Sequence, residues 1–317
     1  QKINHYLCGY FSGNDIIHQP FFSESNLVRM YFVIQPDSLQ SIDFNEEEIE
    51  QHISTMAQSW GDNFLTELTN VYDYAQAKLM FSLYSKAMGL GYKERYSPAI
   101  AVKDIKYIEA VKGESIAIAV YRPVRGKDLL GIKLFQRDVE QVELSDIFPV
   151  LSSMNLRVLQ ESTSQIQFPN MLTLHIADLQ CEPLSGALGD ISLLKKYIKD
   201  YLFEVFKGRT IADGFGSLAI SSKFTPRKVE LFRVYAMYLR QINYSLELKT
   251  IQAAFVLYPQ LVIKLFELFS LRFSPKNRDD AAYGVVRKEL IISLSDVPLL
   301  DHDRVFRMYI KLIDHTL

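Results

Sequence analysis

The spacing of the apolar residues changes along this chain, and the change limits the folds that it can adopt. Between Glu114 and Phe206, runs rich in β-branched residues alternate with helical patterns in the order strand, strand, helix, strand, strand, helix. Beyond Gly208, every periodic segment has the three- and four-residue spacing of a helix. We therefore expect a small two-layer α+β sandwich that is followed by an all-helical domain.

The segments before Glu114 are predicted from the same two periods. The first forty residues have the pattern of short strands, and the clearest strand lies at 26–34. More helix is expected to about Met88, and a further helix from Ser97-Pro98 to Gly113, because Ser caps free N–H groups and Pro is tolerated at the first helical position. Apolar residues at helical spacing define one continuous stripe before these helices: Ile49, Ile53, Met56, Ala57, Trp60, Phe64, Leu68 and Val71.

The elements expected after Glu114 have the following bounds. Strands are predicted at 115–121, 129–135, 156–166 and 171–179, and helices at 145–155 and 190–206. The C-terminal helices are predicted at 225–242, at 246–273 with a break at Pro259, at 281–294 and at 301–316. The helix that begins at Thr225-Pro226 is expected to bury Phe232, Tyr235, Ala236, Leu239 and Ile242.

Charge and cysteine content narrow the class of protein. The 317 residues carry a formal net charge of −2, so no global basic field exists to hold nucleic acid. The two cysteines, Cys8 and Cys181, form neither a disulfide framework nor a zinc knuckle, which fits a reducing compartment. The most apolar stretch, 250–263, is interrupted by Pro259 and is shorter than the ~20 residues that a bilayer needs. We expect a cytoplasmic fragment of a longer protein, with no membrane or nucleic-acid partner.

One string resembles a phosphate-binding loop. Gly214-Phe-Gly216-Ser-Leu-Ala219 matches the GxGxxG/A pattern of dinucleotide-binding folds. That pattern binds pyrophosphate only between a buried strand and a long helix, and neither is predicted beside it. We interpret the string as a turn between helices.

Metal ligands and nucleophiles are not found in a recognisable arrangement. The six histidines form no HExxH motif, His175 is expected to be a core or edge residue of a strand, and Asp301-His302-Asp303 is interpreted as a helix N-cap. There is no GxSxG, and Glu46-Glu47-Glu48 is expected to be solvated. We therefore predict no catalytic, cofactor-binding or metal-binding residue in this chain.

Two segments have an uneven charge. The segment from Asp43 to Asp73 carries eight Asp or Glu and no Lys or Arg, whereas residues 190–272 carry thirteen Lys or Arg and seven Asp or Glu. The basic and aromatic residues of the second segment follow a helical spacing, so a buried stripe is favoured over a nucleic-acid surface: Arg233, Tyr235, Tyr238 and Arg240. Both charged segments are expected to be solvated or to dock on each other.

Several blocks of the sequence carry a resemblance that changes this interpretation. The clearest are Asp213–Leu218, Lys228–Ile242, Thr250–Pro259 and Leu265–Pro275, and they are accompanied by Tyr92–Glu109, Leu144–Val158 and Asp301–Ile313. In this order they resemble the N-terminal half of the large bacterial NAD-dependent glutamate dehydrogenases. The resemblance implies that the α+β part is an ACT-like (ferredoxin-like) module, that the tail holds the helical motifs of the family, and that the catalytic lysine and nicotinamide-binding fold lie beyond Leu317.

The resemblance also implies a division of the chain into three domains. Residues 1–112 would hold partial ACT-like strands followed by helices, of which the part before about Val71 is the remnant of a preceding ACT-like unit. Residues 113–208 would form the ACT-like α+β domain, and residues 209–317 a helical domain that leads to the catalytic domain.

The chain departs from the ACT pattern at two places. The turn between the first strand and the first helix, Gln136–Glu143, contains no glycine, which disfavours capture of a ligand carboxylate by its backbone. No strand follows the closing helix, and we expect Ser115–Tyr121 to occupy the position of that missing strand.

The expected function is that of a non-catalytic regulatory and assembly region. The parent enzyme would oxidise L-glutamate to 2-oxoglutarate and ammonia with NAD, and this chain itself would need no cofactor. Its partners would be its own catalytic domain, neighbouring subunits and an amino-acid effector, with coupling through partly exposed final helices, including Val305–Ile313. A purely structural oligomerisation scaffold and, less favoured, a nucleic-acid or protein adaptor remain as alternatives.

Overall fold

The computed structural model describes ten ranges of the chain: residues 2–22, 28–36, 44–57, 59–123, 128–137, 142–169, 172–184, 188–242, 246–276 and 278–316. Two compact units are present. The first comprises residues 1–85 with 97–99, and the second comprises residues 86–96 with 100–317. The division into three domains rests on the family resemblance and not on contacts between residues, so it stays a prediction.

The first unit begins with a helix and a two-stranded antiparallel sheet. The helix α1 (Lys2–Phe11) precedes β1 (Gly13–Phe22), which pairs with β2 (Val28–Pro36). The predicted strand at 26–34 corresponds to β2, but the expectation of strands throughout the first forty residues is wrong for α1. Ile3, Tyr6, Leu7 and Tyr10 have helical spacing, and Leu7 is buried, so this short helix has an apolar face of its own.

The predicted helical stripe of the first unit is divided between two helices. The helices α2 (Glu46–Ala57) and α3 (Trp60–Thr69) are separated at Ser59, and α4 (Tyr74–Ala87) follows. Ser59 and Asp62 form a capping box, in which each side chain accepts a hydrogen bond from the backbone N–H of the other, at 3.2 and 3.1 Å. This cap starts a new helix, which buries Phe64 and Leu68, whereas Val71 lies beyond its end and is exposed.

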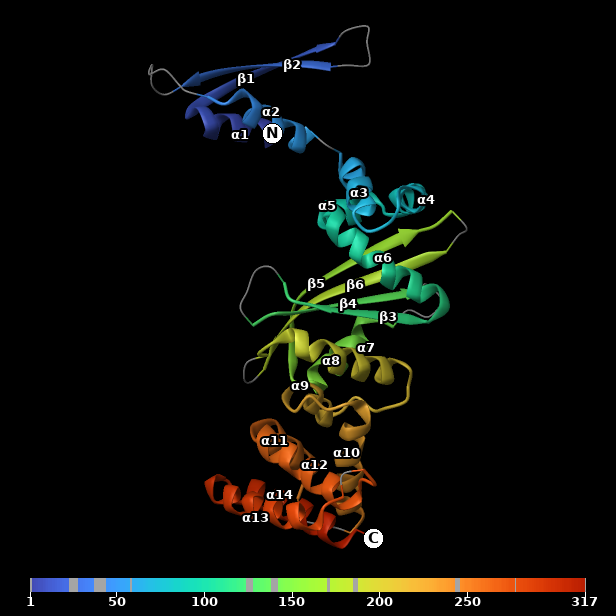
Figure 1. The fold of residues 1–317 in the computed structure, drawn as a ribbon, viewed down its shortest axis with the longest axis vertical. Coiled ribbons are helices and arrows are strands. Elements are labelled where there is room, and N and C mark those ends of the chain that lie inside the picture. The colour runs from blue at the N-terminus through green and yellow to red at the C-terminus, as the bar shows by residue number, and fades with distance from the viewer. Residues whose placement is uncertain are drawn as a thin grey trace. The chain divides into compact units, whose positions relative to one another are not determined.

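The second unit contains a four-stranded antiparallel sheet with helices on both faces (Figure 1). Two helices, α5 (Leu90–Arg95) and α6 (Pro98–Gly113), come before the strands β3 (Ile116–Tyr121) and β4 (Leu130–Arg137). After α7 (Leu144–Ser153), the strands β5 (Leu156–Gln167) and β6 (Thr173–Pro183) form a hairpin that leads to α8 (Ile191–Phe206). These elements confirm the predicted succession and the α+β class.

The order of the strands is β3-β4-β6-β5, with all neighbours antiparallel. The elements β4, α7, β5, β6 and α8 follow the β-α-β-β-α part of a ferredoxin-like unit, in which the last strand of the unit pairs with the first. Here β3, which precedes the unit in sequence, pairs with β4. The prediction that Ser115–Tyr121 occupies the position of the missing strand is confirmed.

Each face of the sheet is covered by helices. The helices α7 and α8 bury Ile147, Val150 and Leu194 against one face. On the other face lies α6, and its Tyr107 stacks on Phe135 of β4 with ring centroids 5.4 Å apart. The helix α6 therefore adds a third layer to the two layers that the sequence predicted, because its apolar residues also pack on the sheet.

The C-terminal helices share one apolar core with the sheet. After a 3₁₀ turn, η2 (Gly214–Ser217), and α9 (Leu218–Ser221), the chain forms α10 (Pro226–Gln241), α11 (Leu248–Leu257), α12 (Pro259–Phe273), α13 (Asp280–Ser293) and α14 (Leu300–His315). The predicted break at Pro259 is confirmed, and α11 and α12 meet at 102°. A single cluster of buried side chains runs from Ile118 of β3 to Ile313 of α14.

Two expectations for these helices are wrong. Ile242 lies just beyond α10 and is 51% exposed, so it does not belong to the inner face of that helix. Most apolar residues between Val305 and Ile313 are buried within this chain, where α14 packs on α11 and α12, and Met308 and Leu312 are half-buried against the same core. Because the stripe of α14 is narrow, its whole apolar face fits into one groove between neighbouring helices.

One cross-strand pair depends on the absence of a side chain. Tyr121 of β3 lies opposite Gly131 of β4, and a Cβ at residue 131 would overlap the Tyr121 ring. We expect Gly131→Val to destabilise the second unit by about 1–3 kcal/mol, because the ring must leave its position over the strand. Urea unfolding measures the loss. Gly113→Ala, where an added Cβ meets open space, is the control, and equal stability of the two variants would contradict the packing of Tyr121.

Candidate functional site

A buried ionic network joins the sheet to the helices α5 and α6, and we call it the ion cluster. Its only cation is Lys133 of β4, which is 4% exposed. The Nζ atom of Lys133 lies 2.8 Å from Oδ2 of Asp104 on α6 and 3.8 Å from Oδ2 of Asp178 on β6. The members of the ion cluster are Tyr92, Tyr96, Asp104, Tyr121, Lys133 and Asp178.

Three tyrosine hydroxyls complete the ion cluster. Tyr92 donates to Oδ2 of Asp104 at 2.8 Å, and Tyr96 donates to Oδ2 of Asp178 at the same distance. Tyr121 donates to the other oxygen of Asp178 at 2.6 Å. Each carboxylate therefore accepts a tyrosine hydrogen bond, and the Lys133 ammonium also lies 3.8 Å from the centre of the Tyr96 ring, a cation–π contact.

Burial decides the protonation of these groups. Burial raises the pKa of Asp104, while the Lys133 ammonium and the Tyr92 hydroxyl act in the opposite direction. Burial, together with the neighbouring carboxylates, raises the pKa of Tyr92, Tyr96 and Tyr121, so these hydroxyls remain protonated donors. The side chains of Lys133, Asp104 and Asp178 are all less than one-tenth exposed. The ion cluster is therefore a buried contact between the sheet and α6, without the solvent access that a substrate site needs.

Two charged residues at inward positions are the sequence signal for the ion cluster. Asp104 lies on the same helical face as Ala101, Ile105 and Ile108, and Lys133 interrupts an otherwise apolar strand. A single charge at an inward position predicts a buried partner of opposite sign. Which charge pairs with which follows only from the packing of α6 on the sheet.

A second buried charge, Arg233 of α10, holds the glycine string. Its Nε and Nη2 atoms donate to the two carboxylate oxygens of Asp213 at 2.8 and 2.9 Å. It also donates to the Thr210 hydroxyl at 2.9 Å, to the Ile211 carbonyl at 3.0 Å and to Glu230. Of the four residues predicted to form a buried stripe, Arg233 is 2% exposed and Tyr235 is half-buried, but Tyr238 and Arg240 are exposed, so the prediction is wrong for these two.

The glycine string forms the turn between helices that was predicted. It lies in η2 and α9. Among the described residues, the helix α8 and not a strand precedes it, and the four-residue α9 and not a long helix follows η2. Its two glycines are required for packing: a Cβ at Gly214 would overlap Gln252, and one at Gly216 would overlap Tyr201. The close approach of the two glycines to Gln252 and Tyr201 shows that the string packs against neighbouring helices.

The glycine-free turn at Gln136–Glu143, where the sequence disfavoured ligand binding, is described only in part, because residues 138–141 lie outside the described ranges. The buried Gln136 side chain accepts a hydrogen bond from the backbone N–H of Val142 at 2.7 Å. This bond joins the described residues on the two sides of the turn.

The remaining candidates have ordinary structural roles. Asp301 and Asp303 lie inside the first turn of α14, where they pair with Arg304 and Arg307, so the N-cap interpretation is wrong: the helix begins at Leu300. His302 between them is buried, and its ring meets that of Tyr258 edge-on. His175 is half-buried in β6. Among the described residues, no group of three or more His, Cys, Asp or Glu could hold a metal ion.

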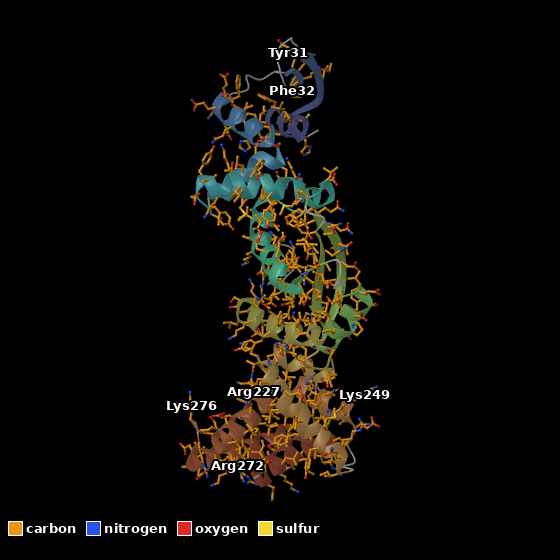
Figure 2. The ribbon with its side chains drawn as sticks, turned by 90° about the vertical axis from the view of Figure 1, so that its right-hand side faces the viewer. Tyr31, Phe32, Arg227, Lys249, Arg272 and Lys276 are labelled. Atoms are coloured by element: carbon orange, nitrogen blue, oxygen red, sulfur yellow. The ribbon has the colours of Figure 1, made fainter. Side chains whose placement is uncertain are left out.

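Four basic residues of the C-terminal part of the chain point in different directions. Figure 2 shows Lys249 and Lys276 projecting in opposite directions, with Arg227 and Arg272 between them. Over the described ranges no single helix is long and apolar enough to cross a membrane, although α11 and α12 pass that test together as a bent pair.

The fold of the second unit defines its class. A sheet of order β3-β4-β6-β5 with α7 and α8 on one face has a ferredoxin-like arrangement. A model of the glutamate dehydrogenase ACT3 domain matches residues 115–192, so this part of the chain is an ACT domain. Three further glutamate dehydrogenase models match in sequence order: the ACT2 domain at 1–61, helical motif 2 at 67–111 and helical motif 3 at 210–275. The chain thus carries this region of the large NAD-specific glutamate dehydrogenases, which confirms the resemblance.

Curated relatives agree with this assignment. The NAD-specific glutamate dehydrogenase of Pseudomonas aeruginosa is 27% identical over 324 aligned residues, which cover 100% of this chain and 20% of the relative. The proteins of the same name from Halomonas elongata and Mycobacterium tuberculosis are 26% and 27% identical, over 94% and 86% of this chain and 18% and 17% of their own lengths. The chain spans about a fifth of the length of these relatives.

Proposed function

We propose that this chain is the non-catalytic regulatory and assembly region of an NAD-dependent glutamate dehydrogenase. The parent enzyme would convert L-glutamate and NAD to 2-oxoglutarate, ammonia and NADH. The observation that carries the proposal is the double attachment of the ACT sheet. The ion cluster ties one face to α6, and one apolar core joins the other face to helices as far as α14.

This double attachment supports a regulatory mechanism. A ligand shifts an equilibrium only when it binds two arrangements of the protein with different affinity. In this fold, a change in the ACT sheet moves packed helices on both faces, because interiors as dense as this one transmit displacement. The helices α10–α14 would pass the change to the catalytic domain.

The proposed partners are the catalytic domain and neighbouring subunits. Four large apolar side chains near the C-terminal end are more than half exposed, which supports contact with further polypeptide: Val285, Ile292, Leu299 and Leu300. The two cysteines are both free, which is consistent with the reducing compartment of a cytoplasmic protein.

A structural scaffold without an effector is the second candidate. The glycine-free sequence of the 136–143 turn favours it, because such a backbone is less suited to capture a ligand carboxylate. In this case the ACT domain would only build the oligomer.

Kinetics of the longer enzyme distinguish these candidates. We expect the 317-residue chain alone to form no NADH from glutamate and NAD, and NADH formation would overturn the proposal. In the longer enzyme, Lys133→Met should change kcat or the response to amino acids at a temperature where the variant remains folded by circular dichroism. Lys112→Met on the surface of α6 is the control. Unchanged kinetics in the folded Lys133→Met enzyme would leave the scaffold as the better description.

A further inference from the structure

One edge of the ACT sheet is open. The strand β3 comes first in the order β3-β4-β6-β5, and no backbone hydrogen bond joins its outer edge to the rest of the described chain. Half of the backbone N–H and C=O groups of an edge strand point away from the sheet, where they can pair with another strand. An open groove of about 600 Å³ lies beside this edge, and its walls are the end of α6, residues 116–118 of β3, α8 and the start of α10.

The strand β3 lacks the features by which proteins prevent an edge from pairing. Charged side chains, prolines and bulges are the usual protections of an edge strand. The six residues of β3 include no charge and no proline, and their register with β4 is regular from Ile116 to Tyr121. Such an apolar and regular edge is expected to be covered in the assembled protein.

The opposite edge of the sheet is protected. The strand β5 contains a bulge, and its Ile166 forms an isolated bridge with Met88. Arg95 donates a hydrogen bond to the Thr163 carbonyl of the same strand at 3.3 Å. Because only one of the two edges is open, pairing at β3 stops at two copies and does not continue into a fibre.

The helix α8, which lies beside β3, has charges that suit an antiparallel copy of itself. Its basic residues Lys195, Lys196 and Lys199 come first, and its acidic residues Asp200 and Glu204 follow. Three of these five residues line the groove. A two-fold axis normal to the sheet that relates two β3 strands also makes the two α8 helices antiparallel. Lys199 of each copy then lies toward Glu204 of the other, so the charges are complementary.

We propose that β3 pairs antiparallel with β3 of a second copy of this chain, which joins two ACT sheets into one continuous sheet. Centred on Ile118, the pairing places Ile116 opposite Val120 of the second copy and Ala117 opposite Ala119. This register keeps paired side chains on the same face of the sheet, with Ile116 and Val120 on the side of α8. The proposal names the subunit contact of the assembly role proposed above and rests on that role.

Sedimentation velocity of the 317-residue chain tests this pairing. We expect a dimer within the range from about 1 to 100 μM protein. A chain that remains monomeric throughout this range would overturn the proposal. Kinetics of the longer enzyme test the regulatory function separately, so failure of one proposal is distinguishable from failure of the other.

Two charge reversals locate the contact. Lys199→Glu and Glu204→Lys should each weaken dimerisation by at least about tenfold, because each places like charges against one another across the two-fold axis. An equimolar mixture of the two variants should restore dimerisation, because opposite charges then face each other again. Lys249→Glu on the exposed face of α11 is the control and should leave the dimer unchanged (Figure 2).

Amide hydrogen exchange then places the contact on the strand itself. The amides of β3 should exchange faster in the dissociated Glu204→Lys variant than in the dimer, because their outward N–H groups lose a partner. Charge reversals that behave like the control, a mixture that does not recover, or unchanged exchange in β3 after dissociation would each overturn the proposal.

Discussion

Replacement of Lys133 by Met should destabilise the second unit by about 3–5 kcal/mol, because two buried carboxylates lose their only cation. The packing of the side chain is nearly conserved, since Met has a similar length and volume. The cost comes from Asp104 and Asp178, which remain in an interior that disfavours their charged forms.

The pH dependence of this variant has an unusual sign. Burial already raises the pKa of Asp104 above its ordinary value of 3.8, and removal of Lys133 takes away the main opposing influence. A folded-state pKa above the unfolded value means that the folded protein binds the proton more tightly. The destabilisation is therefore complete above the raised pKa, and stability returns as the pH falls through it toward 3.8.

Urea unfolding at pH 7 and pH 5 measures both effects. Relative to the wild-type chain, Lys133→Met should lose less stability at pH 5 than at pH 7. Lys112→Met is the matched control, because Lys112 pairs with Glu109 on the surface of α6 and its loss should cost less than about 1 kcal/mol. Equal losses in the two variants would show that the ion cluster is not buried as described.

Replacement of Arg233 by Met should cost about 2–4 kcal/mol, the second largest effect that we expect. The guanidinium group neutralises Asp213 and satisfies the Ile211 carbonyl, and Met can do neither. Without it, the segment before η2 loses its connection to α10, so Gly216 should also lose its close packing on Tyr201.

Thermal unfolding and near-UV circular dichroism measure this change, with Tyr201 as a reporter of the turn. Arg307→Met is the control, because Arg307 is half-exposed on α14 and pairs with Asp303 one turn before it. An Arg233→Met variant as stable as this control would refute the role of Arg233 in holding the turn. Asp213→Asn should reproduce part of the loss, since the amide keeps one acceptor for the guanidinium group.

The sequence was sufficient for most elements of the second unit. The strands and the helices α6, α7 and α8 follow from local period, because each element buries one face whose spacing is visible in the chain. Pro259 predicted the break between α11 and α12, since proline cannot continue the preceding helix.

The sequence was less reliable where two patterns compete. The apolar residues from Ile49 to Val71 continue across Ser59 with helical spacing, but the capping box with Asp62 provides a better local hydrogen bond and starts a new helix. The helix α1 was missed because its aromatic residues also favour strands, and burial of Leu7 decides between the two.

By itself the sequence determined the succession of helices and strands in the second unit and the family blocks, because both depend on residues close together in the chain. Only the tertiary structure decided that Lys133 meets Asp104 and Asp178, and that Arg233 pairs with Asp213. These groups come from different elements of the chain, and their meeting depends on the packing of the α6, sheet and helical layers rather than on any local pattern.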